Sequence, residues 1–134
     1  MDEPLVPGVR YEPGYVLLTA AGDIDIFTVA RLREDLLTLA DSGQPVIADL
    51  DRVTFLGAAG LGALAGAARR AGARGTSLHV ACARPQTRQL IQLTDLDRTL
   101  RLARTPDDAL RVLPAAQPPQ PVPVPPGGDD DDDD

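Results

Sequence analysis

The sequence predicts a single α/β domain built on a mixed, mostly parallel sheet of about five strands with about four helices. The chain has 134 residues, which is enough for one hydrophobic core and too few for two. Hydrophobic residues make up 43% of it but aromatic residues only 3%, so Leu, Val, Ile and Ala must build the core. Strand-like and helix-like segments alternate along the chain, which is typical of mostly parallel sheets joined by right-handed crossovers.

The first predicted elements are two strands and a helix. Residues 15–20 are rich in strand-forming side chains, and a weaker strand at residues 9–11 can pair with them through a turn at Pro13-Gly14. Thr28 then occupies the position of a helix N-cap, and Ser42-Gly43 ends that helix. The apolar residues that recur at helical spacing are Val29, Leu32, Leu36 and Leu39. We expect the helix to pack on the sheet through this face.

The middle of the chain predicts a buried strand, a second helix and a further strand. Residues 45–50 are a short apolar run suited to a central strand, and residues 53–56 lead into a helix that ends near Gly72. Residues 76–82 alternate between the two sides of a strand. We expect the side that carries Cys82 to be buried and the side that carries His79 to be partly exposed.

The last predicted elements are a third helix, an edge strand and a short final helix. Pro85 fits the first turn of a helix, and residues 99–103 are suited to an edge strand. Thr105 followed by Pro106 is a strong helix start, because Thr can cap the helix and Pro is favoured at its first position. This helix must end before Pro114.

The two ends of the chain differ in composition from its middle. Residues 114–126 are rich in proline, and a Gly-Gly pair and six aspartates at 129–134 follow them. This composition predicts a disordered linker and a charged tail. Residues 1–8 predict a flexible N-terminus, so the predicted domain spans residues 9–113.

Charge and composition exclude several classes of function. The formal net charge is −7, and because the final six aspartates carry most of it, the rest of the chain is close to neutral. Without an excess of basic residues we expect no nucleic-acid partner. The first residues lack the basic and apolar regions of a signal peptide, and no apolar run is long enough to span a bilayer. We therefore expect a cytoplasmic protein that does not insert into a membrane.

Several segments follow one another in a set order: residues 22–25 with Thr28, 46–50, 53–56, 60–62, 90–97 and 105–110. Taken together, they resemble the STAS domain of anti-sigma factor antagonists. The resemblance covers residues 9–113 and implies a STAS-like mixed sheet in a regulatory protein that is not an enzyme and needs no cofactor. It further implies binding to an anti-sigma factor of the GHKL-type serine kinase class, and through it control of sigma-factor-dependent transcription.

The resemblance also identifies a position at which this chain departs from the family pattern. In the family, a Ser or Thr is phosphorylated where the third strand meets the second helix, usually within Asp-Ser-Ser-Gly or Asp-Ser-Thr-Gly. The matching residues here are Gly57-Ala58-Ala59-Gly60. Ala58 has no nucleophilic oxygen, so the usual phosphoswitch cannot operate there. Two outcomes stay open: a binder that permanently resembles the unphosphorylated form, or a diverged partner with a different input.

The second helix is the predicted docking surface, because residues 58–68 carry no charge and are mostly small. A surface helix normally has a charged outer face, so a smooth uncharged one favours close approach by a partner. The alternative is that Ala is present only as a good helix former. The predicted partner-binding residues are Asp23, Asp25, Gly57, Ala58, Ala59, Gly60, Gly62, Ala63, Gly66 and Arg70.

Two other functions stay open at this point. The resemblance also fits a STAS subunit of a transport or lipid-trafficking complex, in which the same helix docks on an ATPase or permease. Asp23 and Asp25 after a strand resemble the nucleophile motif of small Asp-dependent phosphatases, but Thr28 comes one position too late and the chain has no Lys. The Asp pairs of the chain are more simply turn residues, so we expect no metal site.

Overall fold

The sheet has four strands in the order β1-β2-β3-β4, which are β1 (Gly8–Glu12), β2 (Tyr15–Ile24), β3 (Val46–Leu56) and β4 (Leu78–Ala81). We analysed a computed structural model, which describes residues 6–113. Strands β1 and β2 form an antiparallel hairpin, whereas β2, β3 and β4 are parallel. This confirms the predicted mixed, mostly parallel sheet.

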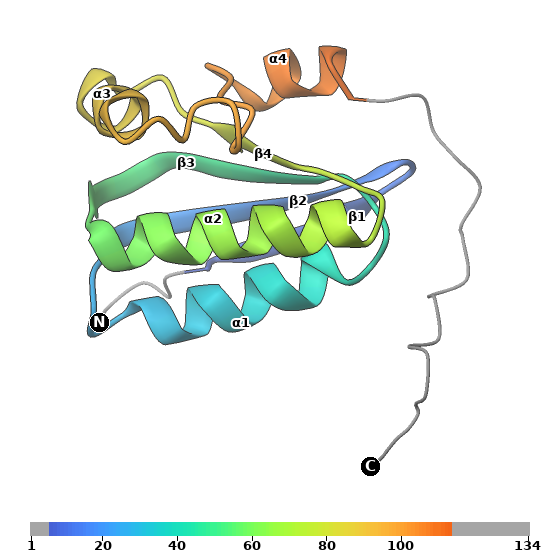
Figure 1. Ribbon diagram of the computed structural model, residues 1–134, viewed down its shortest axis with the longest axis horizontal. Helices are drawn as coiled ribbons and strands as arrows, with labels where there is room; N and C mark the ends of the chain where they lie inside the picture. Colours follow the sequence, from blue (N-terminus) through green and yellow to red (C-terminus); the bar gives the residue numbers. More distant parts are fainter. Residues whose placement is uncertain (1–5, 114–134) are drawn as a thin grey trace.

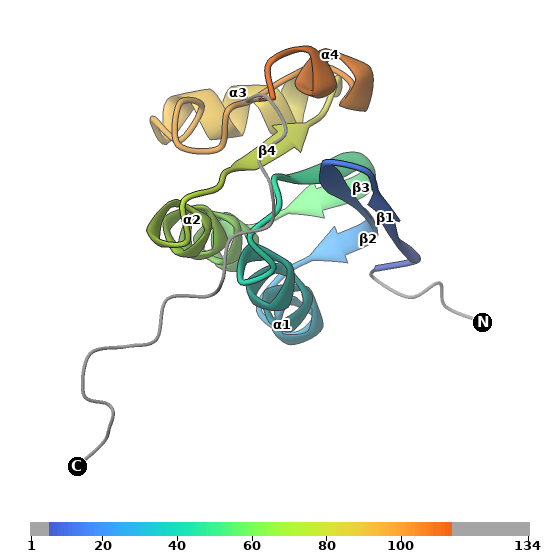
Figure 2. The same ribbon diagram turned by 90° about the vertical axis from the view of Figure 1, so that its right-hand side faces the viewer.

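Helices cover both sides of the sheet (Figure 1). The helices are α1 (Val29–Ala40), α2 (Ala58–Ala73), α3 (Pro85–Leu93) and α4 (Pro106–Arg111). Helices α1 and α2 lie side by side below the sheet, and α3 and α4 lie on its other side next to β4 (Figure 2). Because parallel β2 and β3 each lead directly into a helix, the starts of α1 and α2 lie at the same end of the molecule.

The main core lies between the sheet and helices α1 and α2. It is built almost entirely from Leu, Val, Ile and Ala, as the composition predicts. Its fully buried large side chains include Leu18, Ile24, Leu32, Leu36, Leu50 and Leu64. A second, smaller cluster lies on the opposite face of the sheet, where Ile47 and Ala81 pack against Ala109 of α4.

The predicted edge strand at residues 99–103 is wrong except at its last residue. Ala103 forms an isolated parallel bridge with Ala81, while the residues before it form turns. Arg101 has a φ of 47°, in the left-handed region that interrupts an extended backbone. The buried side chain of Leu100 holds this segment against the core. The sheet therefore has four strands rather than about five.

The prediction that His79 is partly exposed is also wrong, because its side chain is fully buried. Its sheet neighbour Ile47 packs against α4, so this face of β4 is covered rather than solvated. His79 Nε2 lies 2.8 Å from the Ser77 hydroxyl, while Nδ1 is buried without a partner among the described residues. Burial, and secondarily the positive charge of Arg101, lower the pKa of His79 to about 4.

The predicted tail at 114–134 lies outside the described residues, as do residues 1–5 of the predicted N-terminus. Within residues 6–113, none of the helices is both long and apolar enough to cross a bilayer.

Candidate docking surface

The candidate site lies at the end of the sheet where β2 and β3 finish. The backbone N–H of Gly57 donates to the carbonyl of Ile24 at 2.9 Å and so ties the two strand ends together. Ala58, the first residue of α2, follows and is exposed. Loop residues at the carboxyl ends of parallel strands commonly form binding sites, so this end is the natural place for a docking surface.

The loop between β2 and α1 is ordered by its own polar groups. The Asp25 carboxylate accepts hydrogen bonds from the backbone N–H of Phe27 at 2.9 Å and of Thr28 at 3.2 Å. The Thr28 hydroxyl donates to the Asp23 carbonyl at 2.7 Å and accepts from the Asp25 N–H. Thr28 is thus the N-cap residue, as predicted, but its side chain stabilises the loop rather than capping the helix.

This ordered loop presents apolar side chains to solvent. Ile26 is 75% exposed and Phe27 is 91% exposed, and Phe55 at the end of β3 is 54% exposed. Only six large hydrophobic side chains within residues 6–113 are exposed, and these three lie at the end where α1 and α2 begin. We call Ile26, Phe27 and Phe55 the apolar ridge. Large apolar side chains exposed at one end of a molecule are candidates for contact with a partner.

The predicted residue Asp23 is exposed at the same end and links the two strands. Its carboxylate accepts a hydrogen bond from the hydroxyl of Thr54 at 2.5 Å. Asp23 and Asp25 are thus both engaged with neighbouring polar groups, which does not favour a nucleophilic role in phosphate chemistry. Within residues 6–113, no group of three or more His, Cys, Asp or Glu side chains is placed to hold a metal ion.

The glycines at the start of α2 allow close packing. A Cβ atom on Gly60 would lie 2.6 Å from Ile24 Cγ2 and 2.6 Å from Leu56 Cδ1, which is shorter than any normal contact. A Cβ atom on Gly57 would lie 3.1 Å from Cε2 of the Phe55 ring. Gly60 therefore seats the helix on the two strand ends, and Gly57 leaves space for the ring of Phe55.

Two of the predicted partner-binding residues on α2, Gly60 and Ala63, require correction, and Ala63 was also predicted on the outer face of the helix. Both are buried, and Ala63 is only 4% exposed, because α2 packs against α1 as well as against the sheet. Gly62 is exposed, while Ala59 and Gly66 are half-buried. The uncharged outer surface of α2 is therefore narrower than the sequence predicts, and Ala58 and Gly62 are its exposed positions near the helix start.

Arg70 is not close to the other predicted residues. It lies three turns along α2 from Ala58, about 18 Å at the usual helical rise. Its guanidinium binds the Asp41 carboxylate at 3.0 Å, beside Arg74, which binds the same carboxylate at 3.1 Å. Arg70 therefore joins the C-terminal ends of α1 and α2 and is separate from the candidate site.

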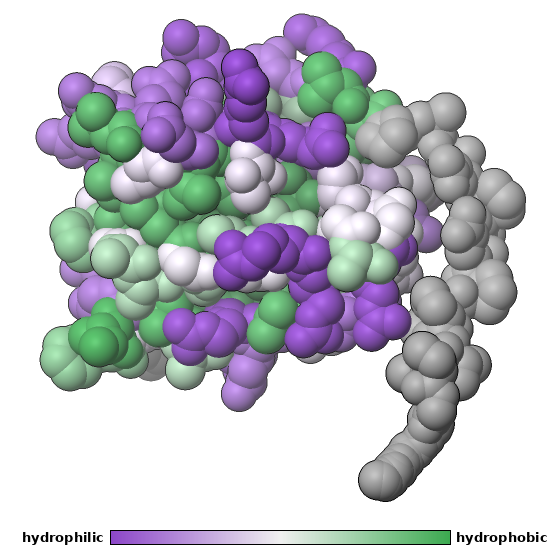
Figure 3. All heavy atoms as spheres, in the orientation of Figure 1, coloured by the Kyte–Doolittle hydropathy of each residue, from purple (hydrophilic) through white to green (hydrophobic). Residues whose placement is uncertain are grey.

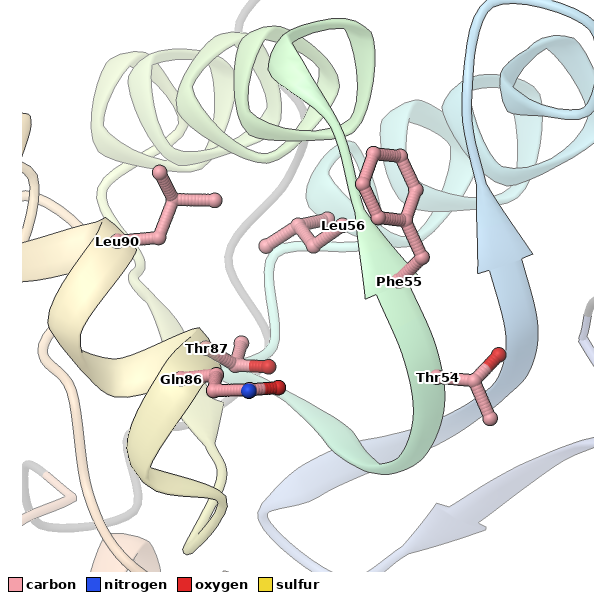
Figure 4. Close-up of a pocket in the computed structure, with 6 residues that line it drawn as sticks. All are labelled: Thr54, Phe55, Leu56, Gln86, Thr87 and Leu90. Atoms are coloured by element: carbon pink, nitrogen blue, oxygen red, sulfur yellow. The ribbon is translucent and has the colours of Figure 1, made fainter.

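A hollow adjoins the apolar ridge on the other side of the end of β3. It has a volume of about 250 Å³ and is lined by Thr54, Phe55, Leu56, Gln86, Thr87 and Leu90. Leu56 and Leu90 point toward one another from β3 and α3, while Gln86 and Thr87 point into the space from the first turn of α3 (Figure 4). Hydrophobic surface is visible between α2 and α3 and again where α1 begins (Figure 3).

Sequence reasoning did not single out the apolar ridge or the hollow. The available signal was Ile26-Phe27, two large apolar residues in a predicted loop, outside any helical or strand pattern. The hollow had no such signal, because it joins β3 and α3, which lie about 30 residues apart in the chain.

Comparisons with known proteins agree with this architecture. The model of the STAS domain family matches residues 7–109. The anti-sigma-F factor antagonist RsfB of Mycobacterium tuberculosis is 37% identical over 98 residues, which cover 72% of this chain and 80% of RsfB. The crystal structure of an anti-sigma factor antagonist from Mycobacterium paratuberculosis matches with a TM-score of 0.72 and 33% identity, covering 78% of this chain and 90% of that one.

A structural match to an anion transporter, at low sequence identity, shows a shared fold and nothing about function. The murine anion transporter Solute Carrier 26 family member A9 matches with a TM-score of 0.64 at 15% identity. The match covers 76% of this chain but only 18% of the transporter. The fold by itself therefore does not separate the possible functions, and the surface has to be considered with it.

Proposed function

The chain belongs to the STAS domain family, and on that premise we propose that it is an anti-sigma factor antagonist. In this role it is a cytoplasmic regulatory protein that acts by binding. It captures an anti-sigma factor and thereby controls sigma-factor-dependent transcription. The kinship with RsfB, at 37% identity over most of both chains, supports this function over a role in a transport complex.

The observation that carries the proposal is the apolar ridge beside the uncharged start of α2. Exposed Phe27 and Phe55 place large aromatic surface where a partner can bury it, and buried aromatic side chains often supply much of the binding energy of an interface. Ala58 and Gly62 have no long side chains that would keep a partner away. A partner protein that covers this end of the molecule would remove the ridge from water.

The same surface is not controlled by phosphorylation at the position that relatives use. The start of α2 presents unsatisfied backbone N–H groups, which would suit a phosphate on a neighbouring hydroxyl. Ala58 offers only a methyl group there, and Gly57 in place of an acidic residue leaves this turn without a carboxylate. The docking surface therefore stays neutral at this turn, and any input that controls binding acts elsewhere.

Binding to purified GHKL-type anti-sigma kinases from the same genome tests the proposal. Isothermal titration calorimetry of the full chain against each of them should give saturable binding to at least one. Release of the sigma factor from that complex, followed by size-exclusion chromatography, is the expected consequence. Failure to bind any of these kinases would rule the proposed function out.

A further inference from the structure

The hollow between β3 and α3 has the shape of a receptor for one side chain. Leu56 and Leu90 form its two apolar walls and point toward one another (Figure 4). Exposed Gln86 provides a polar margin from the first turn of α3, and the buried Thr87 lies beside it. Thr54 turns toward β2 and away from the space. The hollow therefore has an apolar centre, and the side chain of Gln86 at its edge can form hydrogen bonds.

The size of the hollow favours a side chain over a complete small molecule. Its volume of about 250 Å³ is below the roughly 300–1,000 Å³ that small-molecule sites usually occupy. A large aliphatic or aromatic side chain, entering from a partner protein, fits a space of this size. Pockets of this kind are where the strongest contacts of protein interfaces are commonly found.

The lining also selects the chemistry of the occupant. The six lining residues carry no charge, so an ionic group would lose its hydration without gaining an opposite charge. An apolar side chain has no charge to desolvate, and on entering it would cover the half-buried Leu90. The backbone beside that side chain can meet the amide of Gln86, which is exposed at the margin.

The hollow is continuous with the apolar ridge, because Phe55 belongs to both. One partner that covers the end of β3 would therefore meet the ridge on one side and the hollow on the other. We propose that the anti-sigma factor inserts a large apolar side chain, such as Leu, Met or Phe, into the hollow between Leu56 and Leu90. This inference rests on the proposed function and extends the docking surface from α2 to α3.

Filling the hollow from this chain's own side tests the inference. Gln86→Phe places a ring in the hollow from an exposed position of α3, and Leu90→Gln makes one wall polar. Gln92→Phe is the matched control, since Gln92 is exposed on another face of the same helix and does not line the hollow. Each full-length variant is titrated against the anti-sigma factor that binds the wild-type chain, and circular dichroism verifies folding.

We expect Gln86→Phe and Leu90→Gln to weaken binding at least about tenfold, as for a central interface contact, and Gln92→Phe to bind as the wild type does. Should Leu90→Gln fail to fold, Gln86→Phe still decides the question. Wild-type affinity in Gln86→Phe would overturn the inference while leaving the proposed function intact. The inference would also be overturned if the wild-type chain self-associates and Gln86→Phe makes it monomeric without weakening its binding to the anti-sigma factor. In that case a second copy of this chain occupies the hollow. No binding by the wild type would remove both proposals.

Discussion

The aromatic ring of Phe55 lies over Gly57, where an added Cβ atom would come within 3.1 Å of Phe55 Cε2. Phe55 lies near the end of β3 and Gly57 precedes α2, so the two residues meet at the turn where the resemblance to the family leads us to expect an acidic residue and a phosphoacceptor. The missing side chain at Gly57 and the exposed ring at Phe55 are therefore two parts of one arrangement. Together they make this turn apolar and leave it without a charge.

This relationship predicts that Gly57→Ala moves the ring and weakens partner binding without unfolding the protein. Gly57 has a φ of −91°, which Ala adopts readily, and the ring is an exposed side chain that can shift. We expect the free energy of unfolding to change by less than about 1 kcal/mol. In a Phe55→Ala background, Gly57→Ala should have no further effect on affinity, which calorimetry of the double-mutant cycle would detect. Additive losses in affinity would disprove the coupling.

Gly60 and Gly62 form a matched pair of glycines in the same helix. A Cβ atom on Gly60 meets Ile24 and Leu56 at 2.6 Å, whereas one on Gly62 has no heavy atom within 4 Å. Gly60→Ala should therefore lower the free energy of unfolding by about 1–3 kcal/mol, as overpacked cores do. Gly62→Ala should raise it by about 0.5–1 kcal/mol, because Ala is the better helix former. Urea denaturation measures both, and equal effects would contradict the packing described.

Ala58→Ser should restore a phosphoacceptor at the start of α2. The residue is exposed and begins the helix, so a hydroxyl there would be accessible to a bound kinase. We expect mass spectrometry to find one added phosphoryl group on the variant after incubation with ATP and the partner kinase, and none on the wild type. Phosphorylation of the wild type to the same extent would mean that another hydroxyl serves as the acceptor.

His79 should make the fold sensitive to acid. Its pKa is about 4 in the folded protein and about 6.5 when unfolded, so on acidification the unfolded chain takes up the proton first. The contribution of the neutral imidazole to the free energy of unfolding is complete above pH 6.5 and is lost as the pH falls toward 4. At pH 4.5 this loss should be about 2–3 kcal/mol.

The control for this prediction is His79→Leu, an apolar side chain of similar size that cannot titrate. Its free energy of unfolding should fall less than that of the wild type between pH 7 and pH 4.5 in urea titrations. Parallel curves for the two proteins would show that His79 does not contribute to acid sensitivity.

Local patterns were enough to predict most of the elements. Apolar residues at helical spacing predicted α1, and Thr105 with Pro106 predicted α4, where the Thr105 hydroxyl does accept the Asp108 N–H at 3.0 Å. Strand propensity and turn residues predicted the β1–β2 hairpin. These signals are local, because each depends on neighbours along the chain.

The errors arose where distant segments decide the outcome. His79 follows an alternating strand pattern, but α4 covers the face that the pattern leaves open. Ala63 lies on the predicted outer face of α2, yet it is buried in a helix that packs against α1. The segment before Ala103 has strand-forming residues but makes turns instead. Whether the second face of a helix or strand is buried depends on which distant segment packs against it. The position of the hollow between β3 and α3 depends on tertiary packing in the same way. Residue spacing along the chain does not reveal either.

The most direct test of the docking surface compares two exposed aromatic residues at opposite ends of the sheet. Phe27 is 91% exposed in the apolar ridge, whereas Tyr11 is 71% exposed on β1, paired with the start of β2. Calorimetric titration of Phe27→Ser and Tyr11→Ser against the anti-sigma factor measures the contribution of each. We expect at least a tenfold loss of affinity for Phe27→Ser, as for an aromatic anchor, and wild-type affinity for Tyr11→Ser. Undiminished binding by Phe27→Ser would contradict the central claim that the partner docks at this end.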